Sequence, residues 1–400
     1  MRDIINNSPT IRFPDFKEVW TTREFKDLVK RSSDKINTDS LSNFKCIELD
    51  SIEKHSGRLL KIYDQNTSFR SVKNMFETND VLVGKLRPKL RKFYYATFDG
   101  CCSTEIWVFK SLGSISKFIY YLIQTPKFQQ ISTVTFGSKM PRSDWYYISE
   151  YPFFLPSLPE QQKIADFLTI VDKKIQALEK KKGLLEQYKK GLMQKVFKQE
   201  IRFKQEDGSD YPEWEEKRLG DIVTFSKGKG ISKSDIELEA TNPCIRYGEL
   251  YTQYGEVIDN IVSHTNLQKE GLVLSEANDV IIPSSGETNI DIATASCVLY
   301  DGIILGGDLN IIKSKMNGVF LAYYMNSHLR LEIAKYGQGV SVVHLYSSHL
   351  KLLKLLVPSL NEQNKIANSL SAIDDKISVV TSQINKKKEW KKGLLQQMFV

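Results

Sequence analysis

The chain contains one long segment twice. The residues "LPSLPEQQKIADFLTIVDKKI" begin at Leu155, the residues "VPSLNEQNKIANSLSAIDDKI" begin at Val357, and the two align without a gap at an offset of 202 residues. The match resumes at "KKGLMQKVF" from Lys189 and at "KKGLLQQMF" from Lys391. A chain of 400 residues has room for about two to four domains, and a segment that occurs twice favours an even number.

Each copy opens with a predicted helix start. A serine precedes a glutamate by three residues at Ser157 and Glu160, and again at Ser359 and Glu362. At this spacing the two side chains cap each other's backbone N–H groups. We therefore expect a long helix in each copy, of about 40 residues and ~60 Å.

The apolar residues of both predicted helices follow the alternating spacing of four and three that is typical of a coiled-coil seam. The seam residues are Ile164, Leu168, Val171, Ile175, Leu178 and Leu185 in the first copy, and Ile366, Leu370, Ile373, Ile377, Val380 and Ile384 in the second. Because a lone helix of this kind leaves its seam in water, we expect the two copies to pack on each other. The alternative is that each helix lies separately on its own domain.

The predicted helices also contain residues that a simple seam would not need. Lysines interrupt the seam at Lys182, Lys189, Lys387 and Lys391, and only Lys189 and Lys391 are equivalent in the two copies. Lysines in a seam cost stability but help to fix register and partner. Glycines inside a helix each cost ~1 kcal/mol against alanine, so we expect close packing or a bend near them. These glycines are Gly183, Gly191 and Gly393.

The regions between the helices are predicted to be small sheets. The segments "DVLVGKL" and "EIWVFK" in the first half, and "DVIIP" and "LNIIK" in the second, have the β-branched and aromatic residues typical of strands. They correspond across the halves, as do "IRFPDF" from Ile11 and "IRFKQEDGSDYPEW" from Ile201. The repeat therefore covers nearly the whole chain, and the predicted fold class is α+β: a mixed domain, a long helix, a second mixed domain and a second long helix. The turn-rich residues 204–214 are the expected linker.

Composition and charge narrow the function classes. With 41% hydrophobic and 26% charged residues the chain is expected to be globular, and it has no run of the ~18 apolar residues that a membrane span needs. We therefore expect a cytoplasmic location and no membrane partner. The formal charge is +8, but residues 173–198 alone carry nine lysines and two glutamates, and residues 376–392 carry six lysines and one glutamate. Such runs are either solvated helix faces or surfaces for an acidic partner or phosphate.

Known catalytic patterns are absent from the sequence. It lacks GxxxxGK[ST], GxGxxG, GxSxG and HExxH motifs. The five cysteines form no CxxC pair and are expected to be buried, and His344 and His349 lack the spacing of a helical metal site, so no metal is predicted. Asp210, Glu215 and Lys217 could suggest a nuclease, but they stand close together in the linker. Catalytic residues are therefore not predicted.

Nucleic-acid binding is the activity that the remaining motifs favour. Arginine and lysine neutralise phosphates, arginine also pairs with guanine, and short polar side chains contact base edges or phosphate oxygens. In the first half the candidates are Lys85, Arg87, Lys89, Arg91 and Lys92. In the second half they are Lys227, Lys229, Lys233, Arg246, Tyr247, Ser284, Ser285, Thr288 and Asn289.

Taken together, these motifs resemble the specificity subunit of Type I restriction-modification enzymes. The resemblance covers essentially the full chain. It depends on the repeated "P-S-L-x-E-Q-x-K-I-A", on the helix ending "K-K-G-L-x-Q", on "NDVLVGKLRPKLRKFYYATFDGCCSTE" and on "YPEWEEKRLGDI".

The resemblance implies a non-catalytic subunit that reads a bipartite DNA target. It implies a target-recognition domain in residues 1–155, a spacer helix in 156–199, a second target-recognition domain in 200–356 and a second spacer helix in 357–400. The two helices would set the gap between the half-sites. Two methylation subunits, which bind S-adenosylmethionine, and two restriction subunits, which use ATP and Mg²⁺, would join this chain, which itself would bind no cofactor.

Two other hypotheses remain open from the residues alone. A DNA-organising coiled-coil protein would pair its helices between chains and show little sequence preference. A self-sufficient nuclease would cut DNA with Mg²⁺ and lose activity when Asp210 or Glu215 is replaced. The length of the predicted helices suits the specificity-subunit interpretation. One turn of B-DNA is ~34 to 36 Å, so a rod of ~60 Å with a reader near each end could reach two major-groove sites about one turn or more apart.

Overall fold

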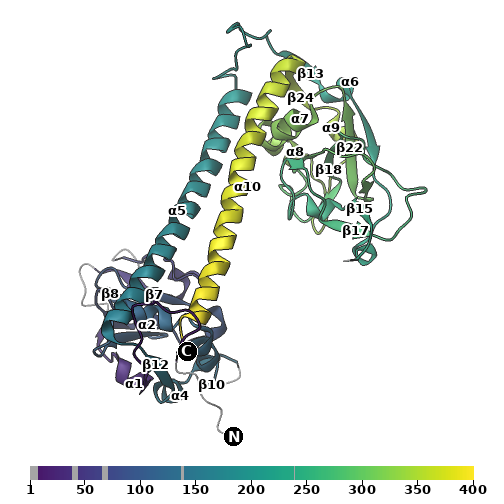
Figure 1. Cartoon of the computed structure of the whole chain (residues 1–400). Helices are drawn as coiled ribbons and strands as arrows, with labels where there is room; N and C mark the ends of the chain where they lie inside the picture. The colour runs from purple at the N-terminus through teal and green to yellow at the C-terminus, as the bar shows by residue number, and fades with distance from the viewer. Residues whose placement is uncertain (1–7, 38–43, 65–70, 137–138, 238) are drawn as a thin grey trace. The chain divides into compact units, whose positions relative to one another are not determined.

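The computed structural model describes residues 8–37, 44–64, 71–136, 139–237 and 239–400. The chain forms two compact units: unit 1 contains residues 1–179 and 382–400, and unit 2 contains residues 180–381. Two long helices, α5 (Leu158–Phe197) and α10 (Leu360–Gln397), each contribute one part to unit 1 and another part to unit 2 (Figure 1).

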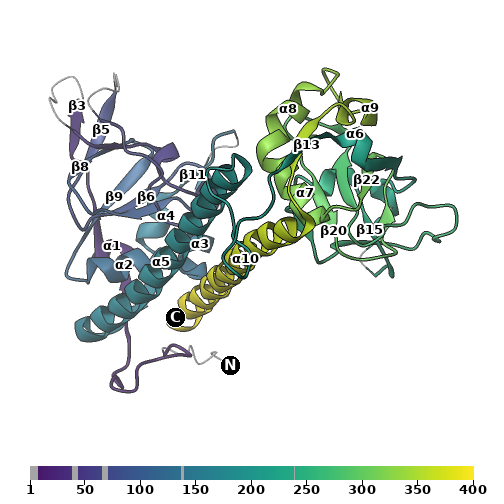
Figure 2. The same ribbon diagram turned by 90° about the horizontal axis from the view of Figure 1, so that it is seen from above.

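Unit 1 contains two four-stranded sheets, in the orders β2-β9-β6-β7 and β3-β5-β8-β4, and the two-stranded pairs β1-β12 and β10-β11. Its strands are β1 (Thr21–Glu24), β2 (Val29–Arg31), β3 (Lys35–Asn37), β4 (Cys46–Ile47), β5 (Val72–Phe76), β6 (Val81–Gly84), β7 (Phe93–Tyr95), β8 (Gly100–Cys102), β9 (Ile106–Ser111), β10 (Thr135–Phe136), β11 (Arg142–Ser143) and β12 (Pro152–Leu155). Its short helices are α1 (Phe25–Leu28), α2 (Ser116–Leu122), α3 (Pro126–Ser132) and α4 (Trp145–Ser149) (Figure 2). Two further short helices are η2 (Leu49–Ser51) and η3 (Pro88–Leu90).

Unit 2 contains a five-stranded sheet, β14-β22-β18-β20-β16, a three-stranded sheet, β17-β15-β21, and the pairs β13-β24 and β19-β23. Its strands are β13 (Glu215–Arg218), β14 (Val223–Lys227), β15 (Asn242–Ile245), β16 (Val257–Ile258), β17 (Ser263–Thr265), β18 (Val280–Pro283), β19 (Ser285–Gly286), β20 (Ser296–Val298), β21 (Ile304–Leu305), β22 (Leu309–Ser314), β23 (Val343–His344) and β24 (Lys354–Val357). Its short helices are α6 (Leu219–Ile222), η4 (Lys233–Asp235), η5 (Tyr247–Glu249), α7 (Gly318–Tyr324), η6 (Met325–Leu329), α8 (Arg330–Lys335) and α9 (Ser347–Leu350).

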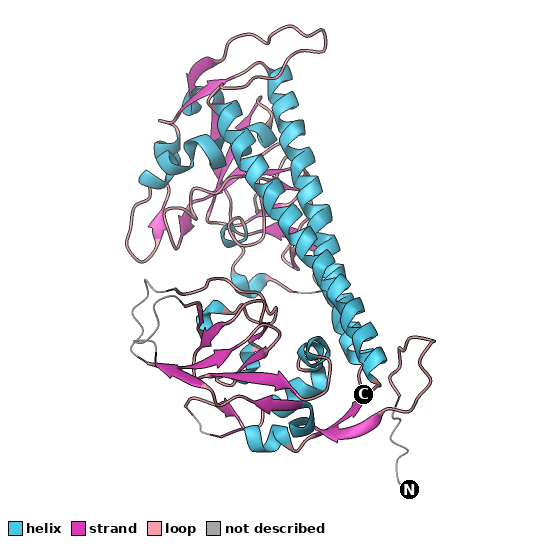
Figure 3. Cartoon of the chain, turned by 90° about the vertical axis from the view of Figure 1, so that its left-hand side faces the viewer, coloured by secondary structure: helices cyan, strands magenta, loops and turns pink. Residues whose placement is uncertain are grey.

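The two units share one frame of strands and helices. In unit 1, β6 pairs antiparallel with β9, which pairs antiparallel with β2; in unit 2, β18, β22 and β14 repeat this arrangement. The first and last strands of each mixed domain also pair, β1 with β12 and β13 with β24. The four predicted strand segments lie in β6, β9, β18 and β22. Strands and helices are mixed in both units (Figure 3), so the predicted α+β repeat is confirmed.

The long helices pair antiparallel within each unit. In unit 1, Ile164, Leu168 and Val171 of α5 share a buried cluster with Leu394 of α10 and Met398 just beyond its end. In unit 2, the partners exchange ends: Ile366, Leu370 and Ile373 of α10 share a cluster with Met193 and Val196 of α5. Since the start of one helix meets the end of the other in both cases, the predicted intramolecular pairing is confirmed.

Most predicted seam residues are buried. Leu185 and Ile377 are half-buried, and the fully buried ones are Ile164, Leu168, Val171, Ile175, Leu178, Ile366, Leu370, Ile373, Val380 and Ile384. Each unit also joins its helical pair to its mixed domain through one core, in which α2 packs against α5 in unit 1 and α7 packs against α10 in unit 2.

Of the two alternatives expected at the helix glycines, close packing is wrong, and a bend stays a prediction. Apart from the neighbouring residues and the backbone of the helix itself, a Cβ atom added at Gly183, Gly191 or Gly393 would meet no atom within 4 Å in the described chain. These glycines therefore lie on open helix faces. The five cysteines are all buried, as expected from the sequence, and their thiols are free. In the part of the chain that the structure describes, no helix combines the length and apolarity that a bilayer span requires.

Candidate nucleic-acid interface

The basic loop of unit 1 follows strand β6 and folds around the short helix η3. Arg87 and Arg91 stand on either side of this helix with φ of 51° and 48°, in the left-handed region. Such a backbone is costly for residues other than glycine and persists only where the surroundings fix it. The Arg87 backbone N–H donates to the carbonyl of Pro141 at 2.8 Å, which ties the loop to the segment before β11.

Three cations of this loop are free to meet a ligand. Arg87, Lys89 and Arg91 are exposed, and their side chains make no hydrogen bond or ion pair within the described residues. Lys92 instead donates to the carbonyl of Leu49, and its burial lowers its pKa. Lys85 is half-buried. A pocket of ≈ 400 Å³ beside the loop is lined by Lys89, Arg91, Pro126, Gln129, Gln130 and Thr133.

The basic segment of unit 2 leaves the end of strand β14. Lys227, Lys229 and Lys233 are exposed, and in the described ranges none of them is paired with a carboxylate. Gly228 lies so close to Gly306 that a Cβ atom would stand 2.0 Å from its carbonyl oxygen, so only glycine fits there. Ile231 has φ of 58°, which is rare for a β-branched residue.

The other candidates of unit 2 are held by the fold. The Arg246 guanidinium donates to Glu249 Oε1 at 2.8 and 3.0 Å, and Glu249 also accepts from Ser263. Tyr247 packs half-buried against a hydrophobic cluster. These two side chains are therefore part of the local structure, with only partial access to a ligand.

The polar loop after β18 is also largely committed to internal bonds. Ser284 and Ser285 are buried. Thr288 donates to Asp291 at 2.7 Å, and Asn289 donates to the carbonyl of Ala334 at 2.9 Å. These contacts stabilise the loop, although Thr288 and Asn289 remain exposed in part.

Several of these segments meet at one end of the main sheet of unit 2. The backbone N–H of Gly228 donates to Leu309, that of Ser284 donates to Asp308, and that of Gly306 donates to Ile245. Lys227, Lys229, Arg246 and Ser284 therefore surround residues 305–309. Lys233 lies on the separate turn η4.

The carboxylates considered for a nuclease site are paired with lysines. Asp210 accepts from Lys204 at 2.5 Å, and Glu215 pairs with Lys217 at 2.8 Å. Both are solvent-exposed in the structure. Within the described ranges, no group of three or more His, Cys, Asp or Glu side chains gathers in a way that could hold a metal ion.

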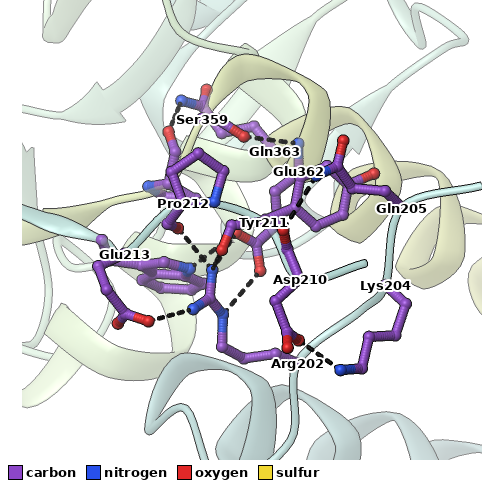
Figure 4. A network of polar contacts seen from close by, with 12 residues as sticks. Arg202, Lys204, Gln205, Asp210, Tyr211, Pro212, Glu213, Ser359, Glu362 and Gln363 are labelled. Carbon is purple, nitrogen blue, oxygen red and sulfur yellow. Dashed lines mark hydrogen bonds and ion pairs between the residues drawn. The ribbon is translucent and has the colours of Figure 1, made fainter. Parts of the chain in front are cut away.

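The repeated glutamates Glu160 and Glu362 do not complete the predicted capping boxes. Glu362 is buried and accepts from Arg202 Nη2 at 2.9 Å and from Trp214 Nε1 at 3.0 Å (Figure 4). Only half of the predicted box is present there, a 3.4 Å bond from the Glu362 N–H to the Ser359 hydroxyl. The carboxylate is drawn away because a guanidinium is a stronger partner than a backbone N–H.

The same cluster occurs in unit 1. Glu160 accepts from Arg12 Nε at 2.7 Å and Arg12 Nη2 at 2.8 Å, and from Trp20 Nε1 at 3.2 Å. The bond to the carboxylate raises the pKa of the arginine in both units, at Arg12 and at Arg202. Each long helix is thus joined at its first turn to the segment that enters the same mixed domain.

The glutamine that follows each glutamate bonds on both sides. Gln161 accepts from the Ile115 N–H at 3.0 Å and donates to the Pro156 carbonyl at 3.0 Å. Gln363 accepts from the Asn317 N–H at 2.9 Å and donates to the Pro358 carbonyl at 2.8 Å. The glutamate and glutamine of the repeated motif therefore hold the long helix against its mixed domain.

A third pair of equivalent clusters joins the two long helices. In unit 1, Lys391 of α10 pairs with Asp172 of α5 at 2.7 Å, and Asp172 also accepts from Tyr121 at 3.0 Å. In unit 2, Lys189 of α5 pairs with Asp374 of α10 at 2.8 Å, and Tyr323 donates to the same carboxylate. Burial raises the pKa of both tyrosines. These are the two lysines at equivalent seam positions.

The sequence contained signals for these clusters. The "IRF" tripeptides at Ile11 and Ile201, each followed by a tryptophan, repeat along with the glutamates. A charged residue that recurs beside an apolar seam indicates a buried partner. However, Arg12 stands 148 residues from Glu160, and Arg202 stands 160 residues from Glu362. Sequence spacing alone cannot join groups at that separation.

The fold defines the class of this protein as a duplicated α+β chain. Its two halves have the same pattern of strand pairing, and the start of each long helix packs on the end of the other. The exposed cations of the two halves lie on different loops. The sequence profile of the family described as "Type I restriction modification DNA specificity domain" matches residues 17–187 and 211–388. The chain belongs to this family.

Individual relatives agree with this assignment. The specificity subunit of the type I restriction enzyme MjaVIII from Methanocaldococcus jannaschii is 24% identical over 294 residues, which are 69% of this chain and 68% of the relative. A second protein from that archaeon, provisionally described as the specificity subunit of the type I restriction enzyme MjaX, is 28% identical over 246 residues, or 60% of this chain. The match spans 56% of that relative's length.

A solved structure supports the same fold. The crystal structure of the S subunit of a type I restriction-modification system from M. genitalium aligns with a TM-score of 0.59 at 17% identity, over 98% of this chain and 99% of that chain. At this level of identity the likeness establishes the fold and leaves the function of the side chains to their own geometry.

Proposed function

We propose that this chain is the sequence-reading subunit of a type I restriction-modification complex. Each mixed domain binds one half of a bipartite DNA target, and the paired helices determine the unread gap between the halves. We propose residues 1–155 and 200–356 as the target-recognition domains, and residues 156–199 and 357–400 as the spacer helices.

One observation carries this proposal: the same arrangement of strands and helices occurs twice, with unlike loops at equivalent places. In unit 1 the loop after β6 offers Arg87, Lys89 and Arg91. In unit 2 the equivalent loop after β18 is polar, and the free cations Lys227 and Lys229 come from the end of β14. A shared frame with unlike loops suits a protein that binds two different short sequences in the same manner.

The proposal assigns chemistry to partners and recognition to this chain. Two methylation subunits that bind S-adenosylmethionine would dock on the helices, and two restriction subunits would supply ATP-dependent cleavage with Mg²⁺. This chain would bind no cofactor and catalyse no step. It would work in the cytoplasm, where these partners meet DNA.

Co-expression with a cognate methylation subunit, followed by mapping of N6-methyladenine, tests the proposal. We expect methylation at a bipartite motif with two unlike half-sites, and no methylation when either partner is omitted. Methylation without sequence preference would contradict it. DNA cleavage by the purified chain alone would contradict it equally.

The alternative of a DNA-organising coiled coil predicts pairing between chains. The clusters of Lys391 with Asp172 and of Lys189 with Asp374 disfavour it, because both join helices of the same chain. Mass measurement of the chain alone and with the methylation subunit separates the two hypotheses. Self-association without the partner, together with binding that is independent of DNA sequence, would favour the alternative.

A further inference from the structure

At one junction, just beyond β6 in unit 1 and β18 in unit 2, the backbone hydrogen bonds are equivalent in the two units but the side chains differ. In unit 1 the N–H of Lys85 donates to Glu105 O at 2.9 Å and the N–H of Ser143 donates to Lys85 O at 2.9 Å. In unit 2 the N–H of Ser284 donates to Asp308 O at 2.8 Å and the N–H of Leu345 donates to Ser284 O at 3.0 Å. Three chain segments therefore meet in the same way where β6 or β18 leaves its sheet.

Two pairs of side chains occupy equivalent positions at this junction. Arg142 of β11 bridges to Leu86, and His344 of β23 pairs with Ser285, so Arg142 and His344 correspond. Glu105 and Asp308 correspond in turn, because each directly precedes the paired strand, β9 or β22. Both sites thus combine an exposed basic side chain with an acidic side chain.

In unit 1 the pair is direct. Arg142 Nε donates to Glu105 Oε2 at 2.9 Å and Arg142 Nη2 donates to Glu105 Oε1 at 3.0 Å. The carboxylate holds one edge of the guanidinium and leaves its remaining N–H groups toward solvent. The free donors of Arg142 are thereby fixed in direction before any ligand binds, which reduces the entropy lost on binding.

In unit 2 a serine connects the two groups. Ser285 Oγ lies 3.2 Å from Asp308 Oδ1 and 3.4 Å from His344 Nδ1. Because a carboxylate only accepts, the Ser285 hydroxyl donates to Asp308 and its oxygen accepts from Nδ1–H of His344. In neutral His344, Nε2 is then an acceptor directed away from this chain of bonds.

The surroundings of both sites contain free cations. The Arg87 N–H bonds to Pro141, next to Arg142, and the Arg87 guanidinium is exposed. The Gly228 N–H bonds to Leu309, next to Asp308, and places Lys227 and Lys229 beside this junction. Cations that can hold phosphates therefore stand beside a polar group of fixed direction in both units.

From this geometry we propose that Arg142 and His344 are equivalent specificity-determining residues. The inference rests on the proposed function and names the contacts within it. Arg142 donates to the N7 and O6 acceptors of a guanine in one half-site. His344 accepts from the amino group of an adenine or cytosine in the other half-site.

The test measures the methylated motif of the complete methylating complex, with this chain unchanged or carrying Arg142→Ala or His344→Ala. We expect Arg142→Ala to lose about 10- to 100-fold discrimination at one guanine of one half-site. His344→Ala should relax one position of the other half-site. Arg142→Gln should shift the preferred base from guanine toward adenine, because glutamine pairs with adenine in the major groove. A residue with a purely structural role would produce no such shift.

Control variants distinguish a loss of base recognition from a loss of stability or of surface charge. Lys26→Ala in unit 1 and Lys354→Ala in unit 2 each remove an exposed, ion-paired cation, and both should leave the motif intact. Thermal unfolding of each variant complex checks its stability.

A clear bipartite motif that neither Arg142→Ala nor His344→Ala alters would overturn this inference and leave the proposed function standing. Relaxation of the same half-site by both variants would overturn it too. Absence of a bipartite motif with the unchanged chain would overturn the proposed function and the inference together.

Discussion

At the scale of single residues, Glu362 shows how a buried charge is made tolerable. Both of its oxygens accept hydrogen bonds, from Arg202 and Trp214, and the carboxylate is inaccessible to solvent. An ionised group in such a place is stable only while every partner remains. Glu362 therefore fixes the first turn of α10 against the chain that enters the mixed domain of unit 2.

Replacing Glu362 with glutamine should destabilise the protein by about 3 kcal/mol, because the half-buried Arg202 loses the buried carboxylate that balances its charge. Denaturant unfolding of the full chain measures this change. Glu213→Gln is the matched control, since Glu213 also bonds to Arg202 but is 89% exposed, and it should change the free energy of unfolding by less than about 0.5 kcal/mol. Equal effects of the two substitutions would refute the role of burial.

The free cations of the unit 1 loop lead to a second prediction. If Arg87 and Lys89 both meet phosphates, the double substitution to alanine should reduce the slope of log K against log salt concentration by about 2. Titration of the assembled complex with its target DNA at several salt concentrations gives this slope. Lys92→Met is the internal comparison: Lys92 is bonded to Leu49, so its loss should affect stability more than the slope. An unchanged slope in the double variant would exclude phosphate contacts at Arg87 and Lys89.

Part of the candidate interface is predictable from the sequence. Charge alone identifies Arg87, Lys89, Arg91 and the exposed lysines of unit 2, and these side chains are free in the described structure. Charge and polarity do not distinguish these residues from Lys92 or Asn289, whose partners lie 43 and 45 residues away along the chain. Arg142 is not predicted, because an isolated arginine has no pattern until the strand pairing places it beside Glu105.

At the scale of elements, the ion pairs of the two seam lysines help to determine the register of α5 against α10. Lys391 bonds to Asp172 and Gln124, and Lys189 bonds to Asp374 and Glu256. A shift of one helix against the other would separate each lysine from its carboxylate and leave both groups partly buried. The register is therefore favoured by two equivalent clusters, in addition to the apolar seam.

A double-mutant cycle on Lys391 and Asp172 measures this coupling. Lys391→Met and Asp172→Asn should each destabilise the protein, and the double variant should lose about 1 to 2 kcal/mol less than the sum of the two. Lys388→Met with Glu179→Gln is the matched control, because that pair is also interhelical but more exposed, and its coupling should stay below about 1 kcal/mol. Additive effects at Lys391 and Asp172 would contradict a role in register.

The elements themselves were largely predictable. The spacing of apolar residues predicted both long helices and their pairing, and the β-branched segments predicted β6, β9, β18 and β22. The predicted capping boxes are incomplete, because local spacing omits the arginines that compete for both glutamates; of the predicted bonds, the one from the Glu362 N–H to Ser359 is present. Close packing at the helix glycines is not found, because a sequence does not reveal that Gly191 and Gly393 lie on open faces.

At the scale of the whole molecule, each repeat supplies the lysine that the other repeat binds, so the pairing of the two repeats is reciprocal. The carboxylate and tyrosine of each helix cluster come from one repeat, and the lysine comes from the other: Asp172 and Tyr121 receive Lys391, while Asp374 and Tyr323 receive Lys189. Each copy therefore carries both the donor and the acceptor halves of the cluster. One copy contains all that is needed to pair with a second copy of itself.

This reciprocity predicts the behaviour of a duplicated chain. In a variant where residues 11–200 replace residues 201–400, the second Lys189 can bond to the first Asp172, and the first Lys189 to the second Asp172. Both Arg12–Glu160 clusters are kept as well. We expect this variant to fold and to direct methylation to an inverted repeat of a single half-site, because both domains would then contain the same loops. Mapping of N6-methyladenine beside the unchanged chain identifies which half-site is retained. If the variant still methylated the original asymmetric target, the two domains would not be separate readers, and a folded complex without any motif would show that the loops of unit 1 depend on unit 2.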